Sequence, residues 1–216
     1  MKIENLSLTK GETLLYLQDK LSACIIPKTM LVKVSEFFKD PATQFEKIET
    51  QFPSSFVKLA IRSSAQDEDT IGESQAGLYH SVLNVKIDRD SIRNAINAVI
   101  ESYKQRGKAN NLAKEQVIIQ EMVREVSSAG VLFTMDMKYG APYFTINYDD
   151  ITGRTDTITS GSGAASNKAL YVFRGATDKV KSSRFVKLLN AAKELENIFN
   201  IQRLDIEFAI DRKKNV

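Results

Sequence analysis

The stretch Phe56-Val57-Lys58-Leu59-Ala60-Ile61-Arg62-Ser63-Ser64 does most to decide the fold. Residues 56–61 are mainly apolar and partly β-branched, which predicts a buried strand that runs straight into the polar stretch Arg62 to Gly77. An arginine at the end of such a strand, beside two serines, can present its planar guanidinium group to phosphate oxygens. An ordinary surface salt bridge would explain this arginine as well.

Two further segments suit an anion. In Gly72-Glu73-Ser74-Gln75-Ala76-Gly77, small residues let backbone amides approach a phosphate closely, although a hairpin turn would need the same residues. The segment lacks the Gly-Lys-Ser/Thr ending of a Walker motif. Lys10-Gly11 stands at the start of an expected helix, where a lysine opposes the positive end of the helix dipole. Such a lysine is tolerated on a solvated surface or is recruited where an anion docks.

An acidic pair lies near the C-terminal end of the chain, in Leu204-Asp205-Ile206-Glu207-Phe208. Alternation along a strand points Asp205 and Glu207 to the same face, where they repel each other unless a cation joins them. Magnesium on nucleotide phosphates is a cation that one or two carboxylates hold, together with phosphate oxygens and water. A solvent-facing acidic edge is the alternative.

Capping signals and apolar spacing predict the remaining elements. Thr9 and Glu12 have the spacing of a capping box, and Asp40-Pro41 offers a cap followed by a proline at the first helical position. Apolar residues at helical spacing predict helices from Asp88 to Tyr103 and over 185–198. The expected strands are Thr29–Val34, 56–61, Gln116–Val123, Gly130–Thr134, Tyr143–Tyr148, Arg154–Thr159 and Leu204–Ile210.

This order of elements predicts an α+β fold of two lobes with a largely antiparallel sheet. We expect the lobes to meet near residues 107–115 and to share one cleft. Residues 1–110 would form the N-terminal lobe with the phosphate-binding loop, and residues 111–216 would form the C-terminal lobe with the acidic strand. The two lobes together would make one binding unit.

Composition excludes several classes of protein. The 216 residues are 43% hydrophobic and 26% charged, as in a globular protein, and contain neither a bilayer-spanning apolar run nor a signal-peptide pattern, so we expect a cytoplasmic location without membrane contact. The net charge of +3 is not concentrated in a basic stripe interleaved with aromatic residues, which argues against nucleic-acid binding. The single cysteine, Cys24, cannot form an internal disulfide, and His80 lacks partners for a zinc site.

Taken in order, these segments resemble the N-terminal nucleotide-binding domain shared by phosphoenolpyruvate synthase and pyruvate phosphate dikinase. The resemblance spans nearly the whole chain and rests on several short motifs in the family's order. They are Lys10-Gly11 with Ile26-Pro27, Ile61-Arg62-Ser63-Ser64-Ala65, Glu68-Asp69, Ser74-Gln75-Ala76-Gly77, Val82-Leu83-Asn84-Val85, Val117 to Val123, Ser128 to Thr134, and Asp205-Ile206-Glu207-Phe208.

The resemblance implies an ATP-grasp-like fold that binds ATP and Mg²⁺, with roles for particular residues. Lys10 and Arg62 would act on the phosphates as catalytic residues, with Ser64, Ala76 and Gly77 in the phosphate-binding region, Gln120, Glu121, Met122 and Val123 at the adenine, and Asp205 with Glu207 at the metal. In such enzymes a phosphoryl group passes to a histidine on a separate domain and onward to a small acceptor, with release of AMP and phosphate. The partners implied are therefore a phosphohistidine domain and an acceptor domain of the same full-length protein. His80 lacks the sequence context of that histidine.

Two departures from the family pattern bear on the function. Residues 147–156 read NYDDITGRTD where phosphoenolpyruvate synthases carry Gly-Leu-Gly-Glu, which puts pyruvate in doubt as acceptor and is more similar to a branch associated with capsule biosynthesis that includes a glutamine kinase. Family members also continue beyond the acidic strand, so we expect this chain to be C-terminally truncated and incomplete as an enzyme. The rival hypothesis is a non-catalytic, regulatory nucleotide-binding module.

Overall fold

The structure, a computed structural model, describes residues 8–53, 57–65, 80–152, 168–213 and 215–216. The chain forms two compact units. Residues 26–122, with 8–19, form the sheet A unit, and residues 123–216, with 20–25, form the sheet B unit. The boundary therefore falls after Met122 and not near residues 107–115, because the strand that begins at Gln116 pairs within sheet A.

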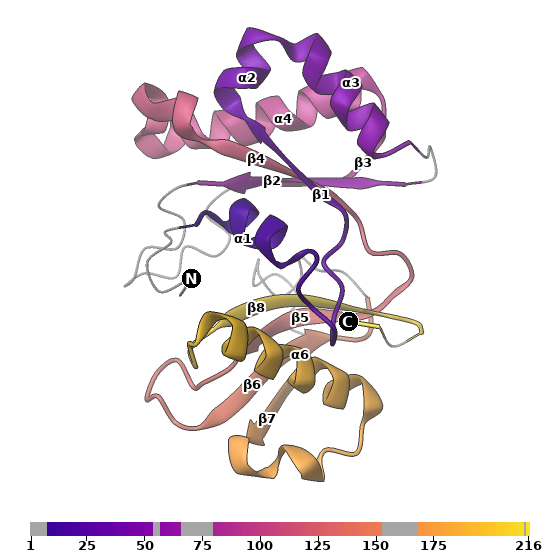
Figure 1. Cartoon of the computed structure of the whole chain (residues 1–216), viewed down its shortest axis with the longest axis vertical. Coiled ribbons are helices and arrows are strands. Elements are labelled where there is room, and N and C mark those ends of the chain that lie inside the picture. Colours follow the sequence, from indigo (N-terminus) through magenta and orange to yellow (C-terminus); the bar gives the residue numbers. More distant parts are fainter. Residues whose placement is uncertain (1–7, 54–56, 66–79, 153–167, 214) are drawn as a thin grey trace. The chain divides into compact units, whose positions relative to one another are not determined.

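Sheet A has the strand order β1-β4-β2-β3, with antiparallel neighbours throughout. Its strands are β1 (Thr29–Lys33), β2 (Leu59–Ser64), β3 (Ser81–Val85) and β4 (Gln116–Glu121). One face is covered by α2 (Val34–Lys39), α3 (Pro41–Gln51) and α4 (Arg89–Tyr103), and the other face carries α1 (Lys10–Leu17) (Figure 1). A π-helical turn (Lys104–Lys108) and a 3₁₀ helix (Ala109–Lys114) lead from α4 to β4.

Alternation along the strands separates the two faces of sheet A. Val32, Val117 and Ile119 belong to a core that includes Phe45 and Ile96 of the covering helices. Residues on the opposite face of the same strands are Leu31, Arg62, Ser64, Gln116 and Ile118. This second face, on which α1 rests, carries polar and charged residues of the sequence-predicted site.

Sheet B has the strand order β7-β6-β5-β8, again with antiparallel neighbours. Its strands are β5 (Val126–Phe133), β6 (Tyr143–Asp149), β7 (Lys168–Phe173) and β8 (Asp205–Asp211). A short 3₁₀ helix (Arg174–Lys179) precedes α6 (Ser183–Phe199), and α6 packs through Phe185 and Leu188 on Leu132 and Phe208 of the sheet. The expected α+β architecture with antiparallel sheets is thus confirmed.

Several elements begin and end where the sequence predicts. Asp40 caps α3, and Asp88 caps α4 by accepting a 2.8 Å hydrogen bond from Ser91 N–H. The strand expected over Thr29–Val34 instead ends at Lys33, because Val34 opens α2 and is buried there. No pattern predicted β7, and the strand expected over residues 154–159 lies outside the described residues.

Strand β2 extends further than predicted. It continues to Ser64, so Arg62 to Ser64 belong to the strand and not to a loop. Pairing with β4 continues to the last residue, where Ser64 faces Gln116. The hydroxyl of Tyr103, which is fully buried, accepts from Ser64 N–H at 2.8 Å and donates to Gln116 C=O at 2.5 Å. Tyr103 therefore ties this end of the sheet to α4.

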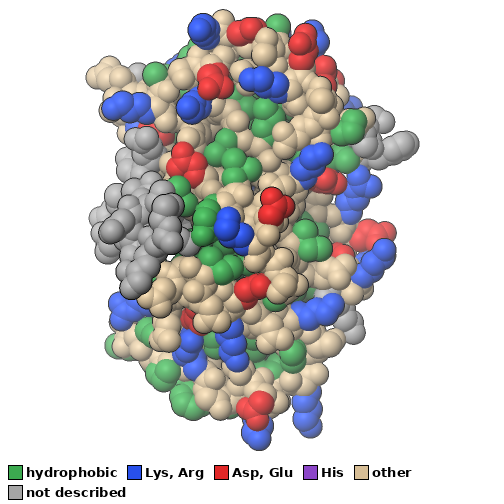
Figure 2. Space-filling view, in the orientation of Figure 1, with side chains coloured by type: hydrophobic (Ala, Val, Ile, Leu, Met, Phe, Trp, Pro, Cys, Tyr) green, Lys and Arg blue, Asp and Glu red, His purple; other side chains and the backbone are tan. Residues whose placement is uncertain are grey.

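Charges of both signs are interspersed over the described residues on the face drawn in Figure 2. Ion pairs such as Lys104–Glu101, at 3.0 Å, join residues that are close in sequence. Exposed pairs contribute at most about 1 kcal/mol each. Apolar cores and buried polar networks therefore account for more of the stability than these pairs do. Among the described residues, no helix has the length and apolar character needed to cross a bilayer.

Replacing Tyr103 with phenylalanine is expected to lower the free energy of unfolding by about 1–3 kcal/mol, because the buried Ser64 N–H and Gln116 C=O both lose the hydroxyl that bridges them. Urea denaturation measures the change. Tyr171→Phe is the matched control, because Tyr171 is 64% exposed and should change the free energy by no more than about 0.5 kcal/mol. Equal effects of the two substitutions would contradict the bridging role.

Candidate functional site

Helix α1 rests directly on sheet A because its second residue has no side chain. A Cβ atom at Gly11 would lie 2.2 Å from Cδ2 of Leu31 and 3.0 Å from Cγ1 of Ile118. The Gly11 N–H also donates to Oγ of Ser64 at 2.9 Å. Lys10, the first residue of the helix, is therefore followed by a residue fixed to the sheet.

A closed ring of hydrogen bonds fixes the residue that precedes Lys10. Thr9 N–H donates to Oε2 of Glu12 at 3.0 Å and Glu12 N–H donates to Oγ1 of Thr9 at 3.3 Å, which confirms the capping box. The Thr9 hydroxyl donates to Oε1 of Gln116 at 3.0 Å, and Nε2 of Gln116 donates to Oε1 of Glu12 at 2.9 Å. The hydrogen bond from the Thr9 backbone N–H, with the other bonds of the ring, holds the pKa of the Glu12 carboxyl below its ordinary value of 4.5.

The two attachments of α1 meet at one cross-strand pair. Gly11 is bound by Ser64, Thr9 is bound by Gln116, and Ser64 and Gln116 are register partners on β2 and β4. The pair is locked in turn by the Tyr103 hydroxyl. The backbone of Lys10 is thus bracketed on both sides. Ser64, expected near a ligand, is fully buried and anchors the helix through Gly11.

Arg62 lies on the same face of sheet A as α1. It is two residues before Ser64 and pairs in register with Ile118, the residue against which Gly11 packs. Its side chain is half-buried. The fold therefore brings the two sequence-predicted phosphate ligands, Lys10 and Arg62, to one face of one sheet.

The expected adenine segment begins at the end of β4 and is pinned to its neighbours. Glu121 N–H donates to Lys28 C=O and Met122 N–H donates to Lys58 C=O, both at 2.9 Å. Nε2 of Gln120 donates to the hydroxyl of Thr29 at 2.9 Å. Met122 is further held because its sulfur accepts from the N–H of Asn84, which has a φ of 61° at a bulge in β3. Among the described residues, none accepts from the N–H of Val123, the first residue of the sheet B unit.

In the sheet B unit, Asp205 and Glu207 lie on the same face of β8, as predicted. Their register partners on β5 are Phe133 and Val131. The alternate residues of β8, Ile206 and Phe208, belong to the core that includes α6. Both carboxylates are exposed. The acidic pair therefore occupies the face of sheet B that α6 leaves open.

A polar clamp fixes the point where β8 begins. Thr134 N–H donates to Leu204 C=O, and Leu204 N–H donates to the Thr134 hydroxyl, both at 3.0 Å. Arg174 donates to Thr134 C=O at 2.7 Å and binds Glu196 of α6 with two bonds of 2.7 and 2.8 Å. Its guanidinium also lies 4.5 Å from the centroid of the Phe144 ring. Asp205 thus follows a residue whose backbone is held on both sides.

Sequence reasoning missed Gln116, Arg174 and Glu196. The sequence does contain an indication of Glu196, because this carboxylate lies on the apolar stripe of α6 with Ala192 and Leu195. A carboxylate that is buried there requires a cationic partner. The sequence contains no such indication of Gln116, because glutamine is an ordinary residue at the start of a strand.

The described residues fit a nucleotide-bound Mg²⁺ and do not form a closed metal cage. Among them, no group of three or more His, Cys, Asp or Glu side chains is placed to hold a metal ion. Two carboxylates on one strand face suit Mg²⁺, which takes its remaining ligands from phosphates and water. The sequence-predicted site residues are divided between the two units. The sheet A unit contains Lys10, Arg62, Ser64, Gln120, Glu121 and Met122, and the sheet B unit contains Val123, Asp205 and Glu207. Two more, Ala76 and Gly77, lie outside the described residues.

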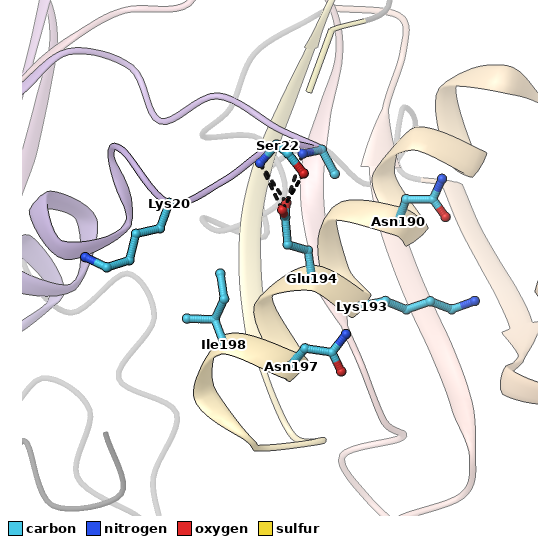
Figure 3. A pocket seen from close by; sticks show the side chains of 8 residues that line it. Lys20, Ser22, Asn190, Lys193, Glu194, Asn197 and Ile198 are labelled. Carbon is cyan, nitrogen blue, oxygen red and sulfur yellow. Dashed lines mark hydrogen bonds between the residues drawn. The ribbon is translucent and has the colours of Figure 1, made fainter. Parts of the chain in front are cut away.

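A hollow of about 480 Å³ in the sheet B unit lies elsewhere, between residues 20–23 and α6 (Figure 3). Within it, Glu194 accepts from Ser22 N–H at 2.9 Å, from the Ser22 hydroxyl at 2.6 Å and from Ala23 N–H at 2.9 Å. These bonds, that of the Ser22 hydroxyl first, lower the pKa of Glu194. Since α6 covers the face of sheet B opposite to Asp205 and Glu207, this hollow is separate from the acidic pair.

Comparison with known proteins gives one family. The family described as the AMP/ATP-binding domain of pyruvate phosphate dikinase matches residues 3–161. That range contains Lys10, Arg62 and the expected adenine segment, and it ends before β8. No curated protein sequence matches the chain.

The lowered pKa of Glu12 predicts a pH dependence of stability. A carboxyl whose folded-state pKa is depressed stabilises the fold above its unfolded value and loses that contribution as pH falls through the folded value. Native protein should therefore be more stable than Glu12→Gln at pH 7, and the difference should shrink as pH falls below 4.5. Urea denaturation at several pH values measures this difference. Glu46→Gln, at an exposed glutamate of α3, is the control, and a gap between native and Glu12→Gln that does not change with pH would contradict the ring.

Proposed function

Since the chain belongs to the pyruvate phosphate dikinase AMP/ATP-binding domain family, we propose that it binds magnesium ATP as the nucleotide domain of a dikinase-type phosphotransferase. The observation that carries the proposal is the placement of Lys10 and Arg62 on one face of sheet A, with the Lys10 backbone bracketed by Ser64 and Gln116. Two cationic residues on one face of a sheet suit a polyanionic ligand.

The cationic pair has a defined task in this proposal. Lys10 and Arg62 bind phosphate oxygens and neutralise charge, and the amides of Ala76 and Gly77 add hydrogen bonds. Phosphoryl transfer of this kind depends on positioning and charge neutralisation more than on a protein nucleophile. Ser64 supports this region by anchoring Gly11.

The backbone at the end of β4 suggests how adenine is bound. Glu121 N–H and Met122 N–H are already used by Lys28 and Lys58, so neither is available to a base. We assign adenine recognition to the N–H of Val123, with Gln120, Glu121 and Met122 supporting that position. The contact between Asn84 and the Met122 sulfur supports the same segment from β3.

Asp205 and Glu207 hold Mg²⁺ on the phosphates in this proposal. When bound, the ion would neutralise negative charge on the phosphates. The chain's own part is to present two carboxylates on one face of β8, whose first residue follows the clamp at Leu204. That arrangement leaves the rest of the coordination sphere to phosphate and water.

The full reaction involves further domains. In the overall reaction, ATP, water and the acceptor, pyruvate or L-glutamine, would give AMP, inorganic phosphate and the phosphorylated acceptor, with one phosphoryl group carried to the acceptor by a histidine on a separate domain of the full-length protein. In the segment that departs from the family pattern, Asp149 accepts from Ile151 N–H and Thr152 N–H, and Asp150 binds Lys168 and Arg184. These local contacts account for the presence of both aspartates without any contact to a phosphoryl acceptor. We propose a cytoplasmic location for this reaction, where ATP is supplied.

Release of AMP tests the complete proposal. The chain is combined with phosphohistidine and acceptor domains, and AMP is measured with pyruvate in one assay and with L-glutamine in another. AMP that depends on one of the two acceptors is the expected result. Binding of ATP without AMP release in either assay would favour a regulatory module that binds nucleotide without turnover.

Magnesium ATP is expected to raise the melting temperature, since a ligand at about 100 times its Kd adds roughly 2.7 kcal/mol. Lys10→Ala and Arg62→Ala should each weaken ATP binding about ten- to a hundredfold, because a hydrogen bond to a charged group contributes about 1.5–3 kcal/mol. Isothermal calorimetry measures both affinities. Lys47→Ala, at an exposed lysine of α3 on the other side of sheet A, serves as the control. Native affinity in both site variants would show that phosphate binds elsewhere.

Asp205→Asn and Glu207→Gln are expected to remove the gain in ATP affinity that Mg²⁺ gives the native chain. The physical reason is that each substitution replaces a charged oxygen ligand with a neutral amide. Titration of ATP with and without Mg²⁺ measures the gain, and circular dichroism checks folding. Asp178→Asn, at an exposed aspartate of the same unit, should keep the full gain. A full Mg²⁺ gain in both site variants would refute the metal assignment.

A further inference from the structure

We infer that Gln116 and Thr9 are positioning residues that set where Lys10 meets the triphosphate. This inference rests on the proposed function and adds to it two residues that do not touch the nucleotide. The observation behind it is the closed ring of Thr9, Glu12 and Gln116, which joins the start of α1 to the first residue of β4.

The ring uses more groups than a helix cap needs. A capping box is complete with Thr9 and Glu12 alone, since each side chain accepts from the other's backbone N–H. Gln116 adds a long-range link, because its amide oxygen accepts from the Thr9 hydroxyl and its amide nitrogen donates to the Glu12 carboxylate. Gln116 is 8% exposed and Thr9 is 7% exposed. Buried polar groups of this kind rigidify a structure when every member is satisfied.

The link acts at the start of α1, where Lys10 is the first residue of the helix. Lys10 lies between Thr9, which is bound to β4, and Gly11, which is bound to β2. A lysine at a helix N-terminus opposes the helix dipole, and the Glu12 carboxylate in the same turn offsets that opposition. The ring therefore sets the position of the Lys10 backbone and the charge around it. The long lysine side chain then reaches the phosphates from a fixed base.

Thr9→Val and Gln116→Met test the positioning role, because each removes hydrogen-bonding groups while keeping a side chain of similar size. Calorimetry on the 216-residue chain gives the Kd for magnesium ATP, and competition against ATP gives the Kd for adenosine, which carries no phosphate. Both variants should weaken ATP about tenfold and leave adenosine within about twofold. Thr9→Ser keeps the hydroxyl and should restore ATP affinity to near the native value.

Asp88→Ala is the matched control, since it removes the N-cap of α4 in the same unit without touching α1. It should lower the melting temperature as Thr9→Val does and leave the ratio of ATP to adenosine affinity unchanged. Equal losses for ATP and adenosine in the ring variants would overturn the inference, because a general structural defect weakens both ligands alike. If one ring variant fails to fold, the other, compared with Thr9→Ser, decides.

The outcomes distinguish failure of this inference from failure of the proposed function. If Lys10→Ala weakens ATP but folded Thr9→Val and Gln116→Met bind ATP with native affinity, the positioning role is overturned and the function stands. If the native chain binds neither ATP nor adenosine, both are overturned. Selective weakening of ATP in both ring variants, with recovery in Thr9→Ser, supports both.

Discussion

The cross-strand pair of Ser64 and Gln116 is the constraint on which the candidate phosphate site depends. Each residue fixes one neighbour of Lys10, and the Tyr103 hydroxyl binds the backbone of both. Because Gly11 has no Cβ, the helix comes close enough to the sheet for both attachments to form. Without these contacts together, packing alone would orient the lysine on a short helix of 8 residues.

The sheet B unit uses the same device at its acidic strand. Thr134 holds both backbone groups of Leu204, and the Arg174–Glu196 pair holds Thr134. In each unit a buried polar network fixes the residue next to a charged one, and the charged side chain itself stays accessible. This division separates stability from binding, because the anchoring groups are satisfied within the protein before any ligand arrives.

The sequence predicted what depends on local chemistry. The capping box of Thr9 and Glu12, the cap at Asp40 and the shared face of Asp205 and Glu207 follow from fixed spacings along a helix or strand. It could not predict that β4 pairs within sheet A, since strand order depends on packing between distant segments. Gln116 was missed for the same reason, because its role depends on hydrogen bonds to Glu12 and Thr9, which lie 104 and 107 positions earlier in the sequence.

The central claim is that Lys10 and Arg62 present one cationic face to the phosphates while Asp205 and Glu207 hold their metal ion. The most direct test is a crystal structure of the chain with Mg²⁺ and a non-hydrolysable ATP analogue. The account predicts a phosphate oxygen within about 3.2 Å of the Lys10 ammonium group, the Arg62 guanidinium beside the phosphates, and Mg²⁺ within about 2.1 Å of an oxygen of Asp205 or Glu207. A nucleotide bound in the hollow against α6, or phosphates distant from Lys10 and Arg62, would contradict it.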